Sequence, residues 1–407
     1  MSLKHIIYWC VSAGLLLNII YTFFYQRDLE LIVAGAPYSW YTRLNFTGDV
    51  LISIASVLSY VCYRKFFPLY IRCCWIGIVL LVFIINHELY EDFLESPAIM
   101  YGPKGFGTFL NFGLLFFVAN KDGLAKVQRM LLAACVVFLV LGIGNLAGLG
   151  FEFSRTESLL HVREYANYLV YVYPFFFLKR SGNKFITVFQ YVFYASMLVI
   201  VLATGSRSYI IVFTLVLLVK LYYTFRKSLA LAIPVLAMVT VLLTAGIMYF
   251  AQSSFFQSLE TMTTTLSERS TDDSRSEQLN EFFDQYDPVN FLWGVGPLGT
   301  YYSSNVGGQY ASIDNQFIFL GWWAGIPVLS LYLTFLIGSL TARNRPCRSW
   351  QDRDSVLCAK WCIFLWILAA AGLAIWVNIS CHLYYYFISI TIGLANYRDQ
   401  EWVDEAR

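Results

Sequence analysis

Apolar runs of about twenty residues recur along the whole chain, and they constrain its fold more than any other feature of the sequence. A helical run of this length matches the hydrocarbon thickness of a bilayer, because each residue adds about 1.5 Å of helix. The chain is 58% hydrophobic and only 13% charged, which lies outside the range of ordinary soluble domains. A helix also satisfies its own backbone hydrogen bonds within lipid. The sequence therefore predicts an all-α polytopic membrane protein.

We expect one transmembrane domain, residues 1–407, with about twelve spans. The expected spans are 6–25, 45–63, 68–86, 106–119, 130–147, 165–178, 185–204, 208–225, 229–250, 315–340, 356–376 and 383–396. A polar segment, 251–314, separates the ninth span from the tenth and is the only long polar interruption of the chain. No other segment between spans is long enough to bury a core of its own.

The distribution of basic residues predicts the orientation of these spans. If the N-terminus is cytoplasmic, the cytoplasmic segments hold 20 of the 28 lysines and arginines, as the retention of positive charge on that side requires. Both termini are then cytoplasmic, and the 251–314 loop is external.

Eight basic residues remain on the predicted external side, and seven of them are arginines. These residues are Arg27, Arg43, Lys104, Arg155, Arg163, Arg207, Arg269 and Arg275. The planar guanidinium group binds phosphate through two hydrogen bonds and keeps its charge, so this bias favours an anionic ligand at the outer leaflet. Lipid headgroups and nearby carboxylates are the competing explanation.

The short connection Thr204-Gly-Ser-Arg-Ser208 contains a single arginine between two apolar runs. A lone charge at a membrane boundary is costly unless it is paired or faces water, so Arg207 is a candidate functional residue. Gly205 permits a sharp turn here, and Ser206 or Ser208 can cap the helix that follows.

A second polar cluster, Gly150–Tyr165, precedes the sixth span and contains Arg155, His161, Arg163 and Glu164. Ser158–Arg163 has the composition of a helix start, and a helix would bring the two arginines to a similar face. The ordinary pKa of histidine lies near neutrality, so His161 is a candidate base, although an interfacial polar role explains it as well.

The large external loop is expected to contain an amphipathic helix within Thr271–Tyr286, lying on the membrane surface with Arg275 near its start. The apolar turn 291–297 and a stretch rich in Tyr, Ser and Gly, suited to contacting sugars, follow this helix. Asp314 stands directly before the tenth span. Helix capping and catalysis are both open roles for its carboxylate.

The order of these motifs resembles the O-antigen ligase and Wzy-type polymerase superfamily over roughly residues 200–340. The resemblance rests on Arg207 at a span start, Arg275 on a loop helix, the Trp293-Gly-Val-Gly-Pro297 turn, and Asp314-Asn315 before a span with Gly321-Trp-Trp-Ala-Gly325. The ligases commonly have His-Asn where this chain has Asp314-Asn315, which favours a polymerase and leaves Glu164 and His161 as substitute bases.

The resemblance implies a multi-span, GT-C-like glycosyltransferase of a bacterial cytoplasmic membrane, with its active site on the external side. It would transfer a growing glycan from undecaprenyl diphosphate to a lipid-linked repeat unit, without a metal or other cofactor. Asp314, Glu164 or His161 would act as the base. Arg207 and Arg275, with Arg155 or Arg163, would bind the diphosphate.

The expected partners are the lipid-linked oligosaccharide donor and acceptor, membrane lipids and a chain-length regulator protein, with no nucleic acid. Two alternatives stay open. One is a ligase that transfers glycan to the lipid A core, and the other is a flippase or transporter of lipid-linked oligosaccharide. A transporter should carry polar residues in the middle of its spans, whereas the polar residues here gather at the external ends.

Overall fold

A computed structural model describes residues 2–33, 40–89, 100–101, 104–149, 155–225, 274–304, 307–311, 313, 315–342, 350–372 and 382–398. The chain divides into two compact units. Unit 1 comprises Met1–Tyr25, Pro37–Leu131 and Asp273–Arg407, and unit 2 comprises Gln26–Ala36 and Leu132–Asp272.

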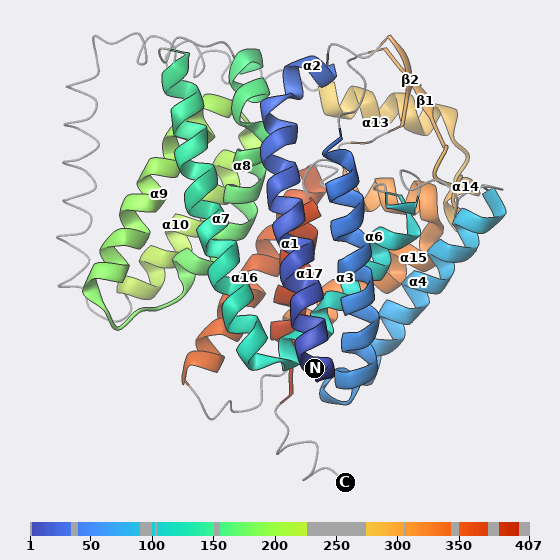
Figure 1. Cartoon of the computed structure of the whole chain (residues 1–407). Helices are drawn as coiled ribbons and strands as arrows, with labels where there is room; N and C mark the ends of the chain where they lie inside the picture. The colour runs from blue at the N-terminus through green and yellow to red at the C-terminus, as the bar shows by residue number, and fades with distance from the viewer. Residues whose placement is uncertain are drawn as a thin grey trace. The chain divides into compact units, whose positions relative to one another are not determined.

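Unit 1 contains most of the helices and a small sheet (Figure 1). Its elements are α1 (Leu3–Arg27, to Tyr25), α3 (Thr42–Tyr63), η1 (Arg64–Phe66), α4 (Leu69–Leu89), α6 (Phe106–Asn111), η2 (Phe112–Ala119), the start of α7 (Lys121–Gly148), α13 (Ser274–Gln285), α14 (Asn290–Trp293), β1 (Tyr301–Ser303), β2 (Gly308–Tyr310), α15 (Gln316–Thr341), α16 (Trp350–Gly372) and α17 (His382–Asn396).

Unit 2 consists of α2 (Leu29–Val33), the remainder of α7, α8 (Arg155–Leu178), α9 (Lys184–Thr204) and α10 (Arg207–Phe225). Helix α8 packs against both α9 and α10. The apolar residues on its inner faces are buried, as expected for helices that pack along a stripe of large side chains.

The prediction of an all-α polytopic membrane protein is confirmed. Among the described residues, seven helices are long and apolar enough to cross a membrane: α1, α3 with η1, α4, α7, α9, α15 and Arg353–Ala371 of α16. Four other expected spans also lie in helical segments, namely α6 with η2, α8, α10 and α17. The expected span 229–250 lies outside the described residues, so the total of twelve stays a prediction.

The expected span 106–119 differs from a regular α-helix. It is α-helical only to Asn111 and continues as the 3₁₀-helix η2. A 3₁₀-helix rises about 2 Å per residue rather than about 1.5 Å, so this short segment extends further than an α-helix of equal length. Residues 112–118 are buried between α3 and α17. This fits an apolar segment with no polar face.

Helix α15 is also irregular, because Gly325 has φ 82° and ψ 165° and divides it into two parts. Pro327 follows two residues later and has no N–H to donate to the preceding turn. The expected span 315–340 is therefore a broken helix, and the break lies beside the Trp293–Pro297 turn.

Candidate functional site

The Trp293–Pro297 turn is bound to the break in α15 through its main chain. The N–H groups of Val295 and Gly296 donate to the carbonyl oxygens of Trp322 and Trp323, at 2.8 and 3.0 Å. In a continuous helix, the Trp323 carbonyl would instead face the nitrogen of Pro327, which carries no proton. The turn thus satisfies carbonyl groups that the helix break leaves without their usual donors.

Two glycines make this contact possible. A Cβ added to Gly294 would lie 2.5 Å from the Trp323 carbonyl oxygen, and one added to Gly325 would lie 2.7 Å from the carbonyl carbon of Trp293. Both glycines have φ of 82°, which a larger residue adopts only with strain. The glycines are therefore required by the close approach of two backbones.

Lys104 contacts the other side of the same turn. Its ammonium group donates to the Pro297 carbonyl oxygen at 3.0 Å and lies about 5 Å from the ring centres of Phe319 and Trp322. Asn86 fixes the main chain on both sides of Lys104, because it donates to the Lys104 carbonyl at 3.2 Å and accepts from Phe106 N at 2.8 Å. Burial lowers the pKa of Lys104 to about 8.

Sequence reasoning did not select Lys104 as a site residue. One signal could have identified it, since it is the only lysine among the eight basic residues on the predicted external side. Lysine is also a residue whose pKa shifts readily when its ammonium group is buried.

Helix α13 is present where a helix was expected, and part of its apolar side contacts protein. Phe282 is fully buried and its ring packs against those of Tyr286, Tyr301, Phe291 and Trp322. The Phe282 side of the helix covers the first part of α15. Phe283 is 50% exposed, and the expected contact of the helix with the membrane surface stays a prediction.

A short antiparallel hairpin occupies the stretch rich in Tyr, Ser and Gly, where no strands were expected. Tyr301 pairs with Tyr310 and Tyr302 pairs with Gln309. Gln285 of α13 exchanges two 2.8 Å hydrogen bonds with the main chain of Tyr302, so its side chain acts as an added strand residue.

Glu281 of α13 makes a second connection to the hairpin. It accepts hydrogen bonds from the hydroxyl and, at 3.2 Å, from the main-chain N–H of Ser304. The hydroxyl bond is the main cause that holds the pKa of the Glu281 carboxyl below its usual value.

Asn315 is the N-cap of α15, and its side-chain oxygen accepts from Phe317 N and Ile318 N at 3.0 and 3.1 Å. Its amide nitrogen donates to the Ala371 carbonyl at 2.9 Å. Asp314 lies outside the described residues. Asn315 already caps the helix, so capping is not needed to explain Asp314 at the preceding position.

In unit 2, the predicted turn before α10 is present. Gly205 has φ 54° and ends α9, where its N–H donates to the Leu202 carbonyl at 3.0 Å. Arg207 is the first residue of α10, which confirms that this arginine stands at a helix start. The structure describes its main chain only.

Glu164 and the start of α10 are connected through side chains. The Glu164 carboxylate is buried, with 1% of its side chain exposed, and it accepts from Asn167 Nδ2 at 3.5 Å. The oxygen of the Asn167 amide accepts a hydrogen bond from the hydroxyl of Tyr209, two residues after Arg207. Gln26 accepts from Glu164 N at 2.6 Å. These contacts place Glu164 and the backbone of Arg207 on adjacent helices of one unit.

The other unit 2 candidates lie on the same helix as Glu164. Helix α8 begins at Arg155, three residues before the expected start, so both arginines of the cluster are helical. Arg163 Nε lies 4.0 Å from Glu164, and half of its side chain is exposed. His161 Nε2 lies 3.0 Å from the Glu30 carboxylate.

The seven predicted site residues therefore fall into two sets. Arg155, His161, Arg163, Glu164 and Arg207 belong to unit 2, and Arg275 and Asp314 belong to unit 1. Arg275 is the second residue of α13, and its side chain is outside the described part of the chain. No set of His, Cys, Asp and Glu side chains in the described ranges could hold a metal ion.

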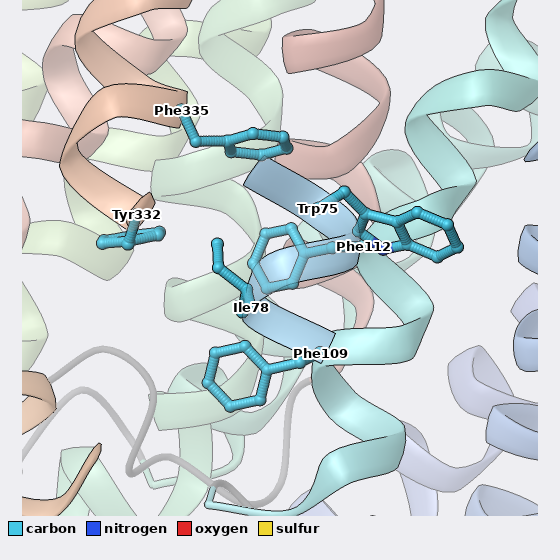
Figure 2. A pocket seen from close by; sticks show the side chains of 6 residues that line it. All are labelled: Trp75, Ile78, Phe109, Phe112, Tyr332 and Phe335. Carbon is cyan, nitrogen blue, oxygen red and sulfur yellow. The ribbon is translucent and has the colours of Figure 1, made fainter. Parts of the chain in front are cut away.

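A small pocket in unit 1 contains none of the candidate residues. Figure 2 shows that it is lined by Trp75, Ile78, Phe109, Phe112, Tyr332 and Phe335. These side chains come from α4, α6, η2 and α15 and are apolar apart from the Tyr332 hydroxyl and the Trp75 indole N–H. That hydroxyl accepts from the Trp366 indole at 3.1 Å. The pocket is part of the apolar core and offers no group for acid–base chemistry.

One comparison with known proteins gives a match to part of the chain. Residues 192–333 match the family model described as O-antigen ligase. The match begins in α9 and includes the Arg207 turn, α13, the Trp293–Pro297 turn, hereafter the glycine turn, and the break in α15. No curated protein matches the chain.

Proposed function

We propose that this chain, a member of the O-antigen ligase/polymerase superfamily through residues 192–333, is a polysaccharide repeat-unit polymerase. The family consists of glycosyl-transferring enzymes that act on lipid-linked glycans, and the chain is a multi-pass membrane protein. The proposed reaction moves the growing glycan from undecaprenyl diphosphate to a hydroxyl of a lipid-linked repeat unit. It takes place at the external face of a bacterial cytoplasmic membrane.

The observation that carries this proposal is the position of three arginines at helix starts. Arg155 is the first residue of α8, Arg207 is the first residue of α10, and Arg275 is the second residue of α13. The helix dipole disfavours a cation at this end by about 0.3–1 kcal/mol, whereas it favours an anion. Free main-chain N–H groups at the same end donate to phosphate oxygens. An anion that contacts both the guanidinium group and the helix start would offset the repulsion between the arginine and the positive end of the helix dipole.

Lipid headgroups could supply the same phosphate chemistry. Lys121 and Lys184 begin α7 and α9 at the side predicted to be cytoplasmic, where headgroup phosphates offset their charge. Only the donor loses its glycan in the reaction. An arginine that binds the donor diphosphate should therefore affect the rate of transfer, whereas an arginine that binds a headgroup should not.

The proposed chemical step is a displacement at the anomeric carbon of the donor. The acceptor hydroxyl oxygen forms the new bond to this carbon, the bond to the diphosphate oxygen breaks, and the diphosphate departs with the electron pair. Arg207 and Arg275, with Arg155 or Arg163, stabilise the charge on the diphosphate. A carboxylate base takes the proton of the hydroxyl.

Asp314 is our choice for that base, since Asn315 performs the capping that would otherwise explain a polar residue at this position. The Glu164 carboxylate is buried and bound to Asn167, and His161 faces Glu30. Both side chains therefore have partners within unit 2. We assign Glu164 to positioning the first turn of α10 through Asn167 and Tyr209.

The test is an assay of glycan chain length with purified lipid-linked repeat units and full-length protein in lipid vesicles. Wild-type protein should give a ladder of products. Arg207→Ala and Arg275→Ala should each lower the rate by roughly 10- to 100-fold, the usual effect of losing a hydrogen bond to a charged group. Asp314→Asn should lower it by about 10²- to 10⁴-fold.

Arg27→Ala is the matched control. Arg27 is also an external arginine by our assignment, but it stands in the last turn of α1, where the dipole favours it, and lies 2.7 Å from Asp28. Its replacement should leave the ladder unchanged. Full activity of Arg207→Ala and Arg275→Ala would remove both arginines from the mechanism.

The ligase is the second candidate, because the matching family model is described as O-antigen ligase. The same assay separates the two activities. A polymerase elongates lipid-linked repeat units when they are the only glycan present. A ligase gives no ladder under these conditions and forms product only after lipid A core is added.

A further inference from the structure

Apolar side chains are exposed on the segment 289–298, which belongs to the loop expected to lie outside the membrane. Trp293 is 77% exposed and Leu298 is 67% exposed, and Val289 and Leu292 are also exposed. Four such residues within ten positions are unusual for a surface that faces only water. These side chains are therefore expected to contact something other than water.

The contacts between α4 and α15 allow the depth of segment 289–298 in the bilayer to be estimated. The two helices run antiparallel, because Gly338 faces Tyr70 and Gly77 faces Leu331. From the level of Tyr70, α4 rises about 28 Å to its last residue, Leu89, which is close to the thickness of a hydrocarbon core of about 30 Å. The distance from Gly338 back to Gly325 along α15 is only about 20 Å.

The glycine turn extends between these two levels. A Cβ on Gly296 would touch Leu89, and a Cβ on Gly325 would lie 2.7 Å from the main chain of Trp293. The main chain of Trp293 is therefore about 8 Å nearer to the bilayer centre than the end of α4. Irregular backbone at this depth requires protein partners, and Val295 and Gly296 have them in the carbonyls of Trp322 and Trp323.

The turn also lies beside exposed apolar side chains of the two spans, because Gly296 is next to Leu89 and the Trp293 main chain is next to Gly325. Leu80, Ile84 and Leu89 are exposed along α4, and Ile326 is exposed on α15 directly after the break. Both helices are long and apolar enough to cross a membrane, so these side chains face lipid. Tryptophan is the residue that most favours the boundary between acyl chains and headgroups.

We infer that residues 289–298 form a re-entrant turn that enters the outer leaflet of the bilayer from the interfacial layer, with Trp293 and Leu298 in contact with bulk lipid. This part of the loop is then anchored in the membrane rather than free in the external space. The lipid contact belongs to α14 and the glycine turn, and the buried Phe282 side of α13 packs on protein. The inference does not depend on the transferase activity.

Photocrosslinking tests this inference in the full-length protein. The photoreactive residue p-benzoylphenylalanine is placed at position 293 or 298, and the protein is reconstituted in vesicles of phosphatidylethanolamine and phosphatidylglycerol. Position 302 is the matched control, because Tyr302 is 52% exposed but lies on the hairpin beside Gln285 and Gln309. After irradiation, intact-mass and peptide mass spectrometry identify the adducts.

We expect phospholipid adducts at positions 293 and 298 and a clear excess over position 302. Equal yields at all three positions would overturn the inference, as would an absence of lipid adducts at 293 and 298. An adduct of twice the chain mass would instead show that a second copy covers the turn. Adducts that form only after polyprenyl phosphate is added would show a substrate groove, and either result would also overturn contact with bulk lipid.

Discussion

In unit 1, main-chain contacts hold the glycine turn on α15, whereas in unit 2, side chains connect the start of α10 to α8. The first contact consists of two main-chain hydrogen bonds and two glycines at positive φ. The second passes from Tyr209 through Asn167 to the buried carboxylate of Glu164. The second contact involves two predicted site residues, Glu164 and Arg207, whereas the first lies within motifs that carry the family resemblance. The two contacts also depend on different properties of the chain.

The difference determines how each region responds to substitution. A main-chain contact between glycines leaves no room for a Cβ, so even a methyl group must displace backbone. A chain of side-chain hydrogen bonds can lose one hydroxyl and keep its packing, at a cost of about 1 kcal/mol. Substitutions in unit 1 should therefore disrupt structure, whereas those in unit 2 should adjust the position of Arg207.

Gly294→Ala should give the largest effect. The added methyl would lie 2.5 Å from the Trp323 carbonyl oxygen, and φ of 82° is strained for alanine. Strain and overpacking together should lower the free energy of unfolding by roughly 3 kcal/mol or more. The midpoint of thermal unfolding in detergent and the rate of proteolysis within 293–299 measure this change.

Gly307→Ala separates strain from crowding. Gly307 also has positive φ, at 68°, but a Cβ there would meet nothing within 4 Å. This variant should lose only about 1 kcal/mol. If the two variants unfold at the same temperature, the contact between the glycine turn and α15 does not stabilise the protein.

The sequence predicted the helical class well because apolar periodicity and length are local properties. The seven apolar spans all fall at expected positions. The break at Gly325 was not predicted, because Gly321, Gly325 and Pro327 are also compatible with a continuous, kinked span. Only the approach of the turn from another part of the chain shows why the helix is broken.

The site was predicted less completely, and the reason is again distance along the chain. Arg207 begins a helix, as the local turn signal indicates, whereas Arg155 begins its helix three residues before the expected start. Lys104 reaches Pro297, almost two hundred positions later, and no local pattern reports such a contact. The sequence left helix capping open as a role of Asp314, whereas the structure shows that Asn315 caps α15. Both residue types cap helices, so their identities alone do not tell which of the two is the cap.

Lys104→Met tests the hydrogen bond that the Lys104 ammonium group donates to the Pro297 carbonyl of the glycine turn. Burial lowers the pKa of Lys104 from 10.5 to about 8 in the folded protein, so the unfolded chain binds more protons between these values. The folded state should therefore become more stable as the pH rises from about 8 to about 10.5. The gain is at most about 3 kcal/mol, and partial exposure of the side chain reduces it.

Methionine cannot be protonated, so this variant should lose the rise in stability over that range. Thermal unfolding at a series of pH values measures the difference. Lys65→Met is the control, since Lys65 Nζ also lies over an aromatic ring, 5.0 Å from the centre of Phe66, but has no contact with the turn. An unchanged pH dependence in Lys104→Met would assign the rise to other groups.

Tyr209→Phe should give the smallest effect and tests the side-chain connection in unit 2. The variant removes the hydrogen bond to Asn167 and leaves the ring in place, so the first turn of α10 becomes less well positioned. If Arg207 binds the donor diphosphate, KM for the donor should rise roughly two- to tenfold, with kcat little changed.

Tyr194→Phe is the matched control, because its hydroxyl also donates within unit 2, to the carbonyl of Phe213 in the second turn of α10. It should lower stability by a similar amount without changing KM. Equal KM values for the two variants would show that Tyr209 stabilises α10 without positioning Arg207. A raised KM in Tyr209→Phe alone would distinguish unit 2, where side chains tune a binding residue, from the glycine turn of unit 1, where backbone contacts preserve the fold.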